Sequence, residues 1–133
     1  MIEILDDITC LHYLSGQPVG RLGFSSGALP VVFPVNYVLE GRTIVFGSEE
    51  GEKARAARAG AVACLEIDRF DTMNHDGWSV LATGRLNVVP ESRADEISRL
   101  PVAPWAIDQP LWWIELSVEL LSGRRISHTG VGT

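Results

Sequence analysis

A hairpin of two apolar strands constrains the fold of this chain more than any other feature. Val31 to Leu39 is rich in β-branched and aromatic residues, which favour extended backbone, and only Pro34 interrupts it. Glu40-Gly41-Arg42 follows as a turn, and Thr43 to Phe46 returns as a second strand. Strands joined by so short a turn pair antiparallel, so we expect an antiparallel sheet.

A short helix and a third strand come next. The alanine-rich run Ala54 to Ala59 is strongly helix-forming, and Gly60 can end the helix in a left-handed conformation. Ala61 to Ile67 is again apolar and predicts a strand.

The turn before this helix has the composition of a phosphate-binding loop. It contains Ser48, Gly51 and Lys53. Backbone N–H groups and the helix dipole favour an anion at a helix N-terminus, and the lysine adds a full positive charge. We therefore expect this turn to bind a phosphate group.

The rest of the chain supplies more strands than helices. A count of about six strands without βαβ alternation favours an antiparallel barrel or sandwich. Gly84 interrupts one strand and predicts a β-bulge or bend there. Further strands are expected at Val19–Ser25, Trp78–Val89 and Leu111–Leu121. A short N-terminal helix, capped by Asp6 or Asp7, is expected to end at Ser15-Gly16, and a second helix is expected at Glu91–Leu100. The sequence also predicts a polar loop at Arg69–Gly77 and a turn with a short extended end at Ser122–Ser127.

Composition limits the classes of protein that this chain can belong to. It has 133 residues, of which 46% are hydrophobic and 21% charged, so we expect one globular domain over residues 1–133 with a frayed glycine-rich tail at 128–133. The net charge of −6 disfavours nucleic-acid binding, and the apolar runs are too short for a membrane span. The N-terminus lacks the features of a signal peptide, so a cytoplasmic location is expected.

Neither thiol chemistry nor a metal site is indicated. Cys10 and Cys64 lie apart in apolar sequence, which is typical of buried structural thiols. One polar loop has a metal-like composition: Asp68, Asp71, His75 and Asp76. These residues lack a fixed two-ligand spacing on a regular element, so a solvated loop is the preferred interpretation. His75, which borders the next strand, is the histidine to consider as a proton donor.

Several short motifs follow one another in order along most of the chain. They are VGRLGF at 19–24, PVVFPVNY at 30–37, G-x-K at 51–53, GWSV at 77–80, GR at 84–85, PW at 104–105 and SGRRIS at 122–127. Together they resemble the pyridoxamine 5′-phosphate oxidase-like family of flavin-binding split barrels, and most closely its actinobacterial branch in which GWSV recurs. The resemblance implies that the chain folds as a six-stranded antiparallel split β-barrel. It also implies that two such chains form a homodimer, which holds FMN in a groove between its subunits.

The resemblance also implies a set of cofactor-binding residues. The flavin ring would be lined by residues of the first hairpin strand: Pro34, Val35 and Asn36. The ribityl chain and phosphate would lie at the end of the next strand, beside Phe46, Gly47 and Ser48. Lys53 would be the main phosphate cation. The pocket would be closed from the partner side by two residues of the GWSV motif: Trp78 and Ser79.

The chain departs from the family around the phosphate. Gly47 stands where relatives usually carry arginine, and three carboxylates flank Lys53: Glu49, Glu50 and Glu52. Carboxylates near a phosphate weaken its binding unless they point away or are screened. Arg55 or Arg58, one helical turn further on, could compensate.

Three functions are compatible with these patterns. The first is a flavin-dependent oxidoreductase that acts on an unidentified small molecule, because a flavin carries the redox chemistry itself. The second is a deazaflavin-dependent reductase, and the third is a non-catalytic module that binds flavin or haem. Asn36 could contact the ring or only satisfy backbone groups, and Trp78 and Trp105 could equally be core or dimer-interface residues.

Overall fold

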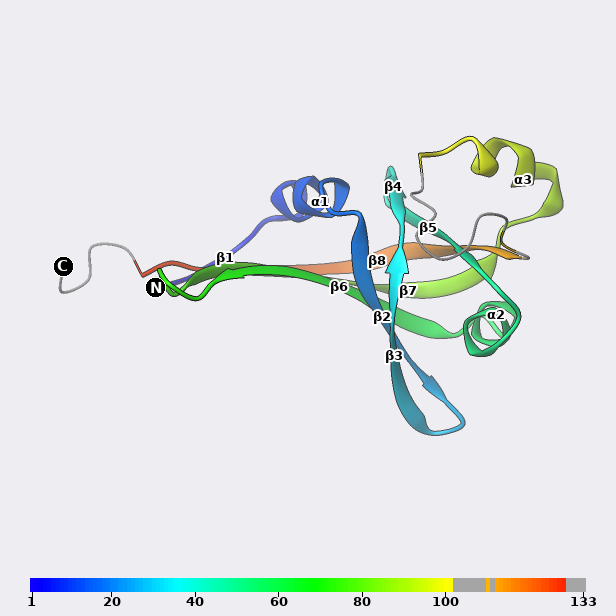
Figure 1. Ribbon diagram of the computed structural model, residues 1–133, viewed down its shortest axis with the longest axis horizontal. Helices are drawn as coiled ribbons and strands as arrows, with labels where there is room; N and C mark the ends of the chain where they lie inside the picture. The colour runs from blue at the N-terminus through cyan, green and yellow to red at the C-terminus, as the bar shows by residue number, and fades with distance from the viewer. Residues whose placement is uncertain (102–109, 111, 129–133) are drawn as a thin grey trace.

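Antiparallel strands form most of the molecule (Figure 1). The computed structural model describes residues 1–101, 110 and 112–128. Their elements, in chain order, are β1 (Ile2–Ile4), α1 (Asp7–Ser15), β2 (Val19–Ser26), β3 (Leu29–Asn36), β4 (Val38–Glu40), β5 (Thr43–Ser48), α2 (Glu52–Arg58), β6 (Val62–Asp71), β7 (Asp76–Val88), α3 (Glu91–Ser98) and β8 (Trp112–Ile126). None of these helices is both long enough and apolar enough to cross a membrane.

The sheet closes into a barrel because β3 and β4 are two parts of one bent strand (Figure 1). Only Tyr37 separates them. β3 pairs with β2, whereas β4 pairs with β5 at the other end of the strand order β3-β2-β6-β7-β8-β5-β4. Counted this way, the barrel has six strands, and the predicted split barrel is confirmed. The short β1 is additional and pairs with the end of β8.

The barrel encloses one large apolar core. Leu22, Leu65, Leu86 and Leu116 are all completely buried and come from four different strands. Tyr37 is buried at the bend, and its hydroxyl donates a 2.6 Å hydrogen bond to the carbonyl oxygen of Leu14. The pKa of Tyr37 is raised because burial disfavours the phenolate. This hydrogen bond ties the end of α1 to the barrel.

The bulge predicted at Gly84 is confirmed. The pairing of β7 with β8 shifts register between Thr83 and Gly84. A Cβ atom at Gly84 would lie 1.7 Å from the carbonyl oxygen of Ser117, so only glycine fits.

Two loop predictions were wrong. β6 continues to Asp71 and β7 already begins at Asp76, so a four-residue turn replaces the predicted loop at Arg69–Gly77. The Asp71 side chain accepts hydrogen bonds from the backbone N–H groups of Met73 and Asn74, which closes this turn. The segment Ser122–Ser127 is not a turn, because β8 runs on to Ile126 between β7 and β1.

The molecule is elongated, with two different ends (Figure 1). The β6–β7 turn, β1 and the end of β8 form one end, and α2 and α3 lie at the other. The predicted PW motif at 104–105 and the predicted tail beyond residue 128 lie outside the described residues.

Candidate functional site

A pocket of about 320 Å³ lies where β5 ends and α2 begins. We call it the lysine pocket. Its walls include Phe33 from β3, Ser48 from the end of β5, and Lys53. The tight turn through Gly51, which has a φ of +153°, leads the chain from β5 into α2. Ser48, Gly51 and Lys53, which the sequence places in one turn, thus share one cavity.

Lys53 is the positive charge of this pocket. Its side chain is half-buried, and Nζ lies 4.9 Å from the centroid of the Phe33 ring, which allows a cation–π interaction. Burial lowers the pKa of Lys53 below its usual value of 10.5, because the charged form loses hydration. Lys53 forms no ion pair with any side chain in the described part of the chain. A bound anion would supply the missing partner.

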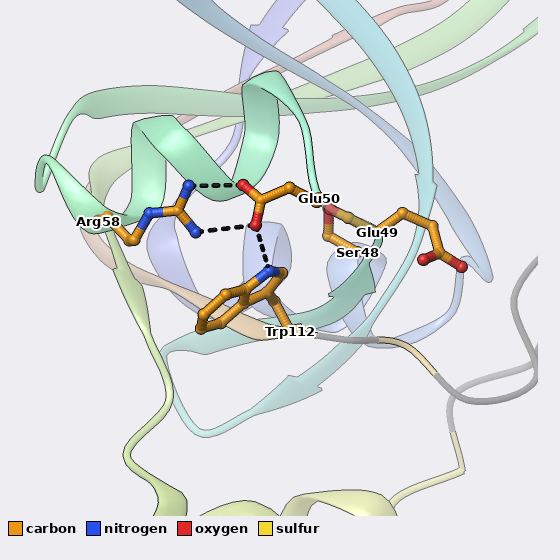
Figure 2. Close-up of polar contacts among 5 residues, drawn as sticks. All are labelled: Ser48, Glu49, Glu50, Arg58 and Trp112. Carbon is orange, nitrogen blue, oxygen red and sulfur yellow. Dashed lines mark hydrogen bonds and ion pairs between the residues drawn. The ribbon is translucent and has the colours of Figure 1, made fainter.

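Glu50 also lines the pocket, and its carboxylate is held in a hydrogen-bond network (Figure 2). Arg58 donates to both of its carboxylate oxygens, at 2.5 and 3.2 Å, and Trp112 Nε1 donates a third hydrogen bond at 2.9 Å. The guanidinium of Arg58 also lies 5.0 Å from the Trp112 ring centroid. The hydrogen bond from Arg58 is the main reason why the pKa of Glu50 is lowered. Arg58 therefore offsets the charge of Glu50, which is one of the three carboxylates that flank Lys53.

The other carboxylates and Arg55 are placed differently. The Glu49 side chain extends away from the Glu50 network (Figure 2) and is exposed. Glu52 is half-buried, and both Glu49 and Glu52 line the lysine pocket. Arg55 is exposed and does not line the pocket. With Glu50 neutralised by Arg58, Glu49 and Glu52 remain as the negative charges that an anion beside Lys53 would meet.

Gly47 and Ser48 are constrained by their neighbours. A Cβ atom at Gly47 would lie 2.7 Å from Cγ of Pro110, so the space that an arginine side chain would need is filled. Ser48 is buried, and its hydroxyl donates to the carbonyl oxygen of Glu49 at 2.7 Å. Pro110 thus gives a physical reason for the glycine at this position.

The residues expected along the flavin divide between core and surface. Phe46, expected near the ribityl chain, is completely buried, and Val35, expected at the ring, is nearly so; both side chains belong to the barrel core. Pro34 is exposed on β3. Asn36 is half-buried, and its Nδ2 donates a 3.3 Å hydrogen bond to the carbonyl oxygen of Pro18. This contact agrees with the alternative interpretation of Asn36, in which its side chain satisfies a backbone group.

Trp78 and Ser79 lie near the start of β7, and the β6–β7 turn that precedes them is at the end of the molecule opposite α2 (Figure 1). The Trp78 indole stacks on Tyr13 of α1, with the ring centroids 4.1 Å apart and the planes inclined by 19°. Trp78 also lines a second pocket of about 570 Å³, which we call the end pocket. Within one chain, therefore, the predicted site residues form two separate groups.

The polar loop that resembled a metal site has other roles. No group of three or more His, Cys, Asp or Glu side chains that could hold a metal ion occurs in residues 1–101, 110 and 112–128. Asp68 forms an ion pair with Arg21 at 2.8 Å, and Asp71 closes its own turn. His75 is exposed in that turn, with its ring 5.5 Å from that of His128.

Sequence reasoning overlooked two features of this region. Trp112 completes the Glu50 network from a position 62 residues further along the chain, and nothing local to Glu50 reveals that contact. Arg125 contacts Tyr13 and Glu3, at 2.8 and 2.9 Å, at the edge of the end pocket. Its position in the SGRRIS motif was the available signal.

Known proteins share both the sequence pattern and the fold. A family model described as pyridoxamine 5′-phosphate oxidase matches residues 6–125. The protein Rv0080 of Mycobacterium tuberculosis is 29% identical over 129 residues, which covers 92% of this chain and 84% of Rv0080. An FAD-binding protein from Mesorhizobium loti superposes with a TM-score of 0.82 at 21% identity, covering 96% and 99% of the two chains. The FAD-binding protein of Mycobacterium smegmatis gives a TM-score of 0.72 at 24% identity, covering 95% and 99%.

Proposed function

The chain belongs to the pyridoxamine 5′-phosphate oxidase family, and from this premise we propose that it is an FMN-binding oxidoreductase acting on a small molecule. A bound flavin supplies the redox chemistry, so the chain's own task is to bind the cofactor, orient it and exclude water. Similar folds in proteins described as FAD-binding support a flavin as the ligand class. The FMN assignment depends on the lysine pocket.

The single observation that carries this proposal is the unpaired charge of Lys53. A half-buried ammonium without a carboxylate partner among the described residues is a binding group for an anion. The pocket is open enough to admit a phosphate, and Arg58 already neutralises the adjacent Glu50. We assign the FMN phosphate to Lys53, with the ribityl chain leading towards the exposed Pro34 and the half-buried Asn36.

Replacing Lys53 by alanine tests this assignment. We expect Lys53→Ala to weaken FMN binding by about 10- to 100-fold, because one charge-assisted contact to the phosphate is lost. Riboflavin, which lacks the phosphate, should bind both proteins equally. Quenching of flavin fluorescence during titration of the purified protein gives both dissociation constants.

Arg55→Ala is the matched control for this experiment. It removes the same charge from the same helix at an exposed position outside the pocket, and should leave FMN binding unchanged. Equal FMN affinity in the Lys53→Ala and unmodified proteins would place the phosphate elsewhere. A protein that takes up deazaflavin or haem but not FMN would overturn the FMN function itself.

We further propose that the cofactor lies between the two subunits of a homodimer. Lys53 lies in α2 and Ser79 near the start of β7, and Figure 1 shows α2 and the β6–β7 turn at opposite ends of the molecule, so a two-fold partner is the simple way to bring the two residues to one ligand. Large apolar side chains on the same face of the sheet as Ser79 are exposed: Phe70, Leu81 and Leu120. Such a face is typical of a surface that a partner covers.

Mixing two defective subunits tests the shared site. Ser79→Leu adds bulk where the partner's flavin would lie, and should weaken FMN binding by about tenfold. A heterodimer of Lys53→Ala and Ser79→Leu subunits holds one site with both natural residues. After subunit exchange in an equal mixture, about one quarter of all sites should regain the original affinity. If binding instead equals the average of the two parent proteins, or if the protein is a monomer in sedimentation, the shared site is wrong.

A further inference from the structure

The end pocket is a second cavity, separate from the lysine pocket in the chain. It lies beside the β6–β7 turn and the end of β8, and has a volume of about 570 Å³. Pockets of this size hold small organic ligands. Its walls combine aromatic and charged side chains, among them Arg69, Phe70, Trp78 and Arg125.

Three of these residues form a row across the sheet. Trp78 of β7 lies directly opposite Arg69 of β6 and directly opposite Arg125 of β8. Directly paired residues of an antiparallel sheet project from the same face. Trp78 is therefore flanked by an arginine on each neighbouring strand, and this combination suits a ligand that has both an aromatic ring and a negative charge.

The indole is held in place from behind. Tyr13 stacks on Trp78, and Arg125 in turn donates to the Tyr13 hydroxyl at 2.8 Å and to Glu3 at 2.9 Å. Because Tyr13 covers one side of an indole that also lines the pocket, Trp78 presents a fixed aromatic surface to a ligand. A fixed surface loses little conformational entropy when a ligand binds.

Arg69 is the free cation of the pocket. Arg125 is committed to Glu3 and Tyr13, whereas Arg69 is exposed and has no hydrogen-bonding or ionic partner among the residues that the structure describes. A guanidinium binds a carboxylate through two parallel hydrogen bonds, which gives both affinity and orientation.

The charge balance favours a single negative charge on the ligand. Two aspartates also line the pocket, Asp71 and Asp76, and both accept hydrogen bonds from backbone N–H groups. Because Arg125 is already paired with Glu3, the two aspartates face Arg69 alone. They repel a ligand with one negative charge less than a doubly charged phosphate, and a single carboxylate can pair with Arg69.

We propose that the end pocket binds a planar aromatic carboxylate, with its ring against Trp78 and its carboxylate on Arg69. Trp78 and Ser79 project from opposite faces of the sheet, so this site is separate from the flavin contact proposed for Ser79. The binding itself does not depend on a flavin.

Isothermal titration calorimetry of the flavin-free protein with 2-naphthoate tests the proposal. We expect saturable binding at one site per chain, weakened at least about tenfold by Arg69→Gln, because a charge-assisted contact is lost. The neutral analogue 2-naphthol should bind at least about tenfold more weakly than 2-naphthoate for the same reason. Trp78→Leu should also weaken the binding of 2-naphthoate. A cooperative thermal unfolding transition confirms that this variant is folded.

Arg124→Gln is the matched control. Arg124 is the adjacent residue on β8, is exposed, and projects from the opposite face of the sheet, opposite Ser79. Its loss changes the net charge as Arg69→Gln does but should leave 2-naphthoate binding unchanged. Equal weakening by both variants would show only a general charge effect and overturn the site. Equal binding of 2-naphthol and 2-naphthoate, or no binding of either, would overturn it as well.

The outcome is separable from that of the proposed function. Lys53→Ala should weaken the binding of FMN and leave the binding of 2-naphthoate unchanged. Arg69→Gln should weaken the binding of 2-naphthoate and leave the binding of FMN unchanged. Binding of 2-naphthoate by a protein that never binds FMN would support the end pocket and overturn the proposed function alone. FMN binding without 2-naphthoate binding would overturn this inference alone.

Discussion

Gly84→Ala is expected to destabilise the protein by about 3–5 kcal/mol or to prevent folding altogether. The added methyl group would lie 1.7 Å from the carbonyl oxygen of Ser117 and 2.8 Å from its carbonyl carbon. Both are backbone atoms of β8, so no side-chain rotation relieves the overlap. β7 and β8 would have to separate at the bulge, in the longest strand pairing of the barrel.

Chemical denaturation of the purified protein measures this effect. Gly16→Ala is the control, because a Cβ atom there meets only ordinary contacts, the nearest at 3.7 Å, and φ is −97°. The control should change the free energy of unfolding by less than about 1 kcal/mol. If Gly84→Ala and Gly16→Ala had the same free energy of unfolding, β7 and β8 would have to be further apart at the bulge than they are in the structure.

Phe46→Ala is expected to lower the free energy of unfolding of the flavin-free protein by about 3–5 kcal/mol. Phe46 is completely buried in the barrel core, and its removal would leave a large cavity that the closed sheet cannot collapse to fill. Phe46→Leu, which keeps most of the apolar volume, should lose only about 1 kcal/mol.

This pair of variants also distinguishes two roles for Phe46. If the side chain contacted the cofactor instead of the core, Phe46→Ala would unfold at the same denaturant concentration as the original protein and lose FMN affinity. With the core role, the stability loss appears in the absence of any ligand. Denaturation followed by tryptophan fluorescence, with and without FMN, separates the two results.

The features that sequence predicted well depend on nearby residues. Asp6 caps α1 by accepting from the N–H of Thr9, and Gly60 follows α2 with a φ of +66°. Both depend on groups within a few residues, so residue type alone indicates them. The barrel class was likewise predictable, because alternating apolar strands with short connections leave few other arrangements.

The contacts that sequence did not reveal depend on which distant residues meet. The closure of the barrel turns the Phe46 side chain into the core. Arg58 pairs with Glu50, and Trp112, 62 residues further along the chain, completes a network that joins α2 to β8. The residues next to Phe46 and Arg58 in the sequence do not indicate these contacts.

By itself, the sequence determined the antiparallel class, the Ser48–Lys53 turn and the bulge at Gly84, because propensities, turn residues and glycine geometry act over short distances. Only the tertiary structure decided that Arg69, Trp78 and Arg125 form one row. That row depends on the register of three long strands, which is set by the packing of the whole core rather than by any local group of residues.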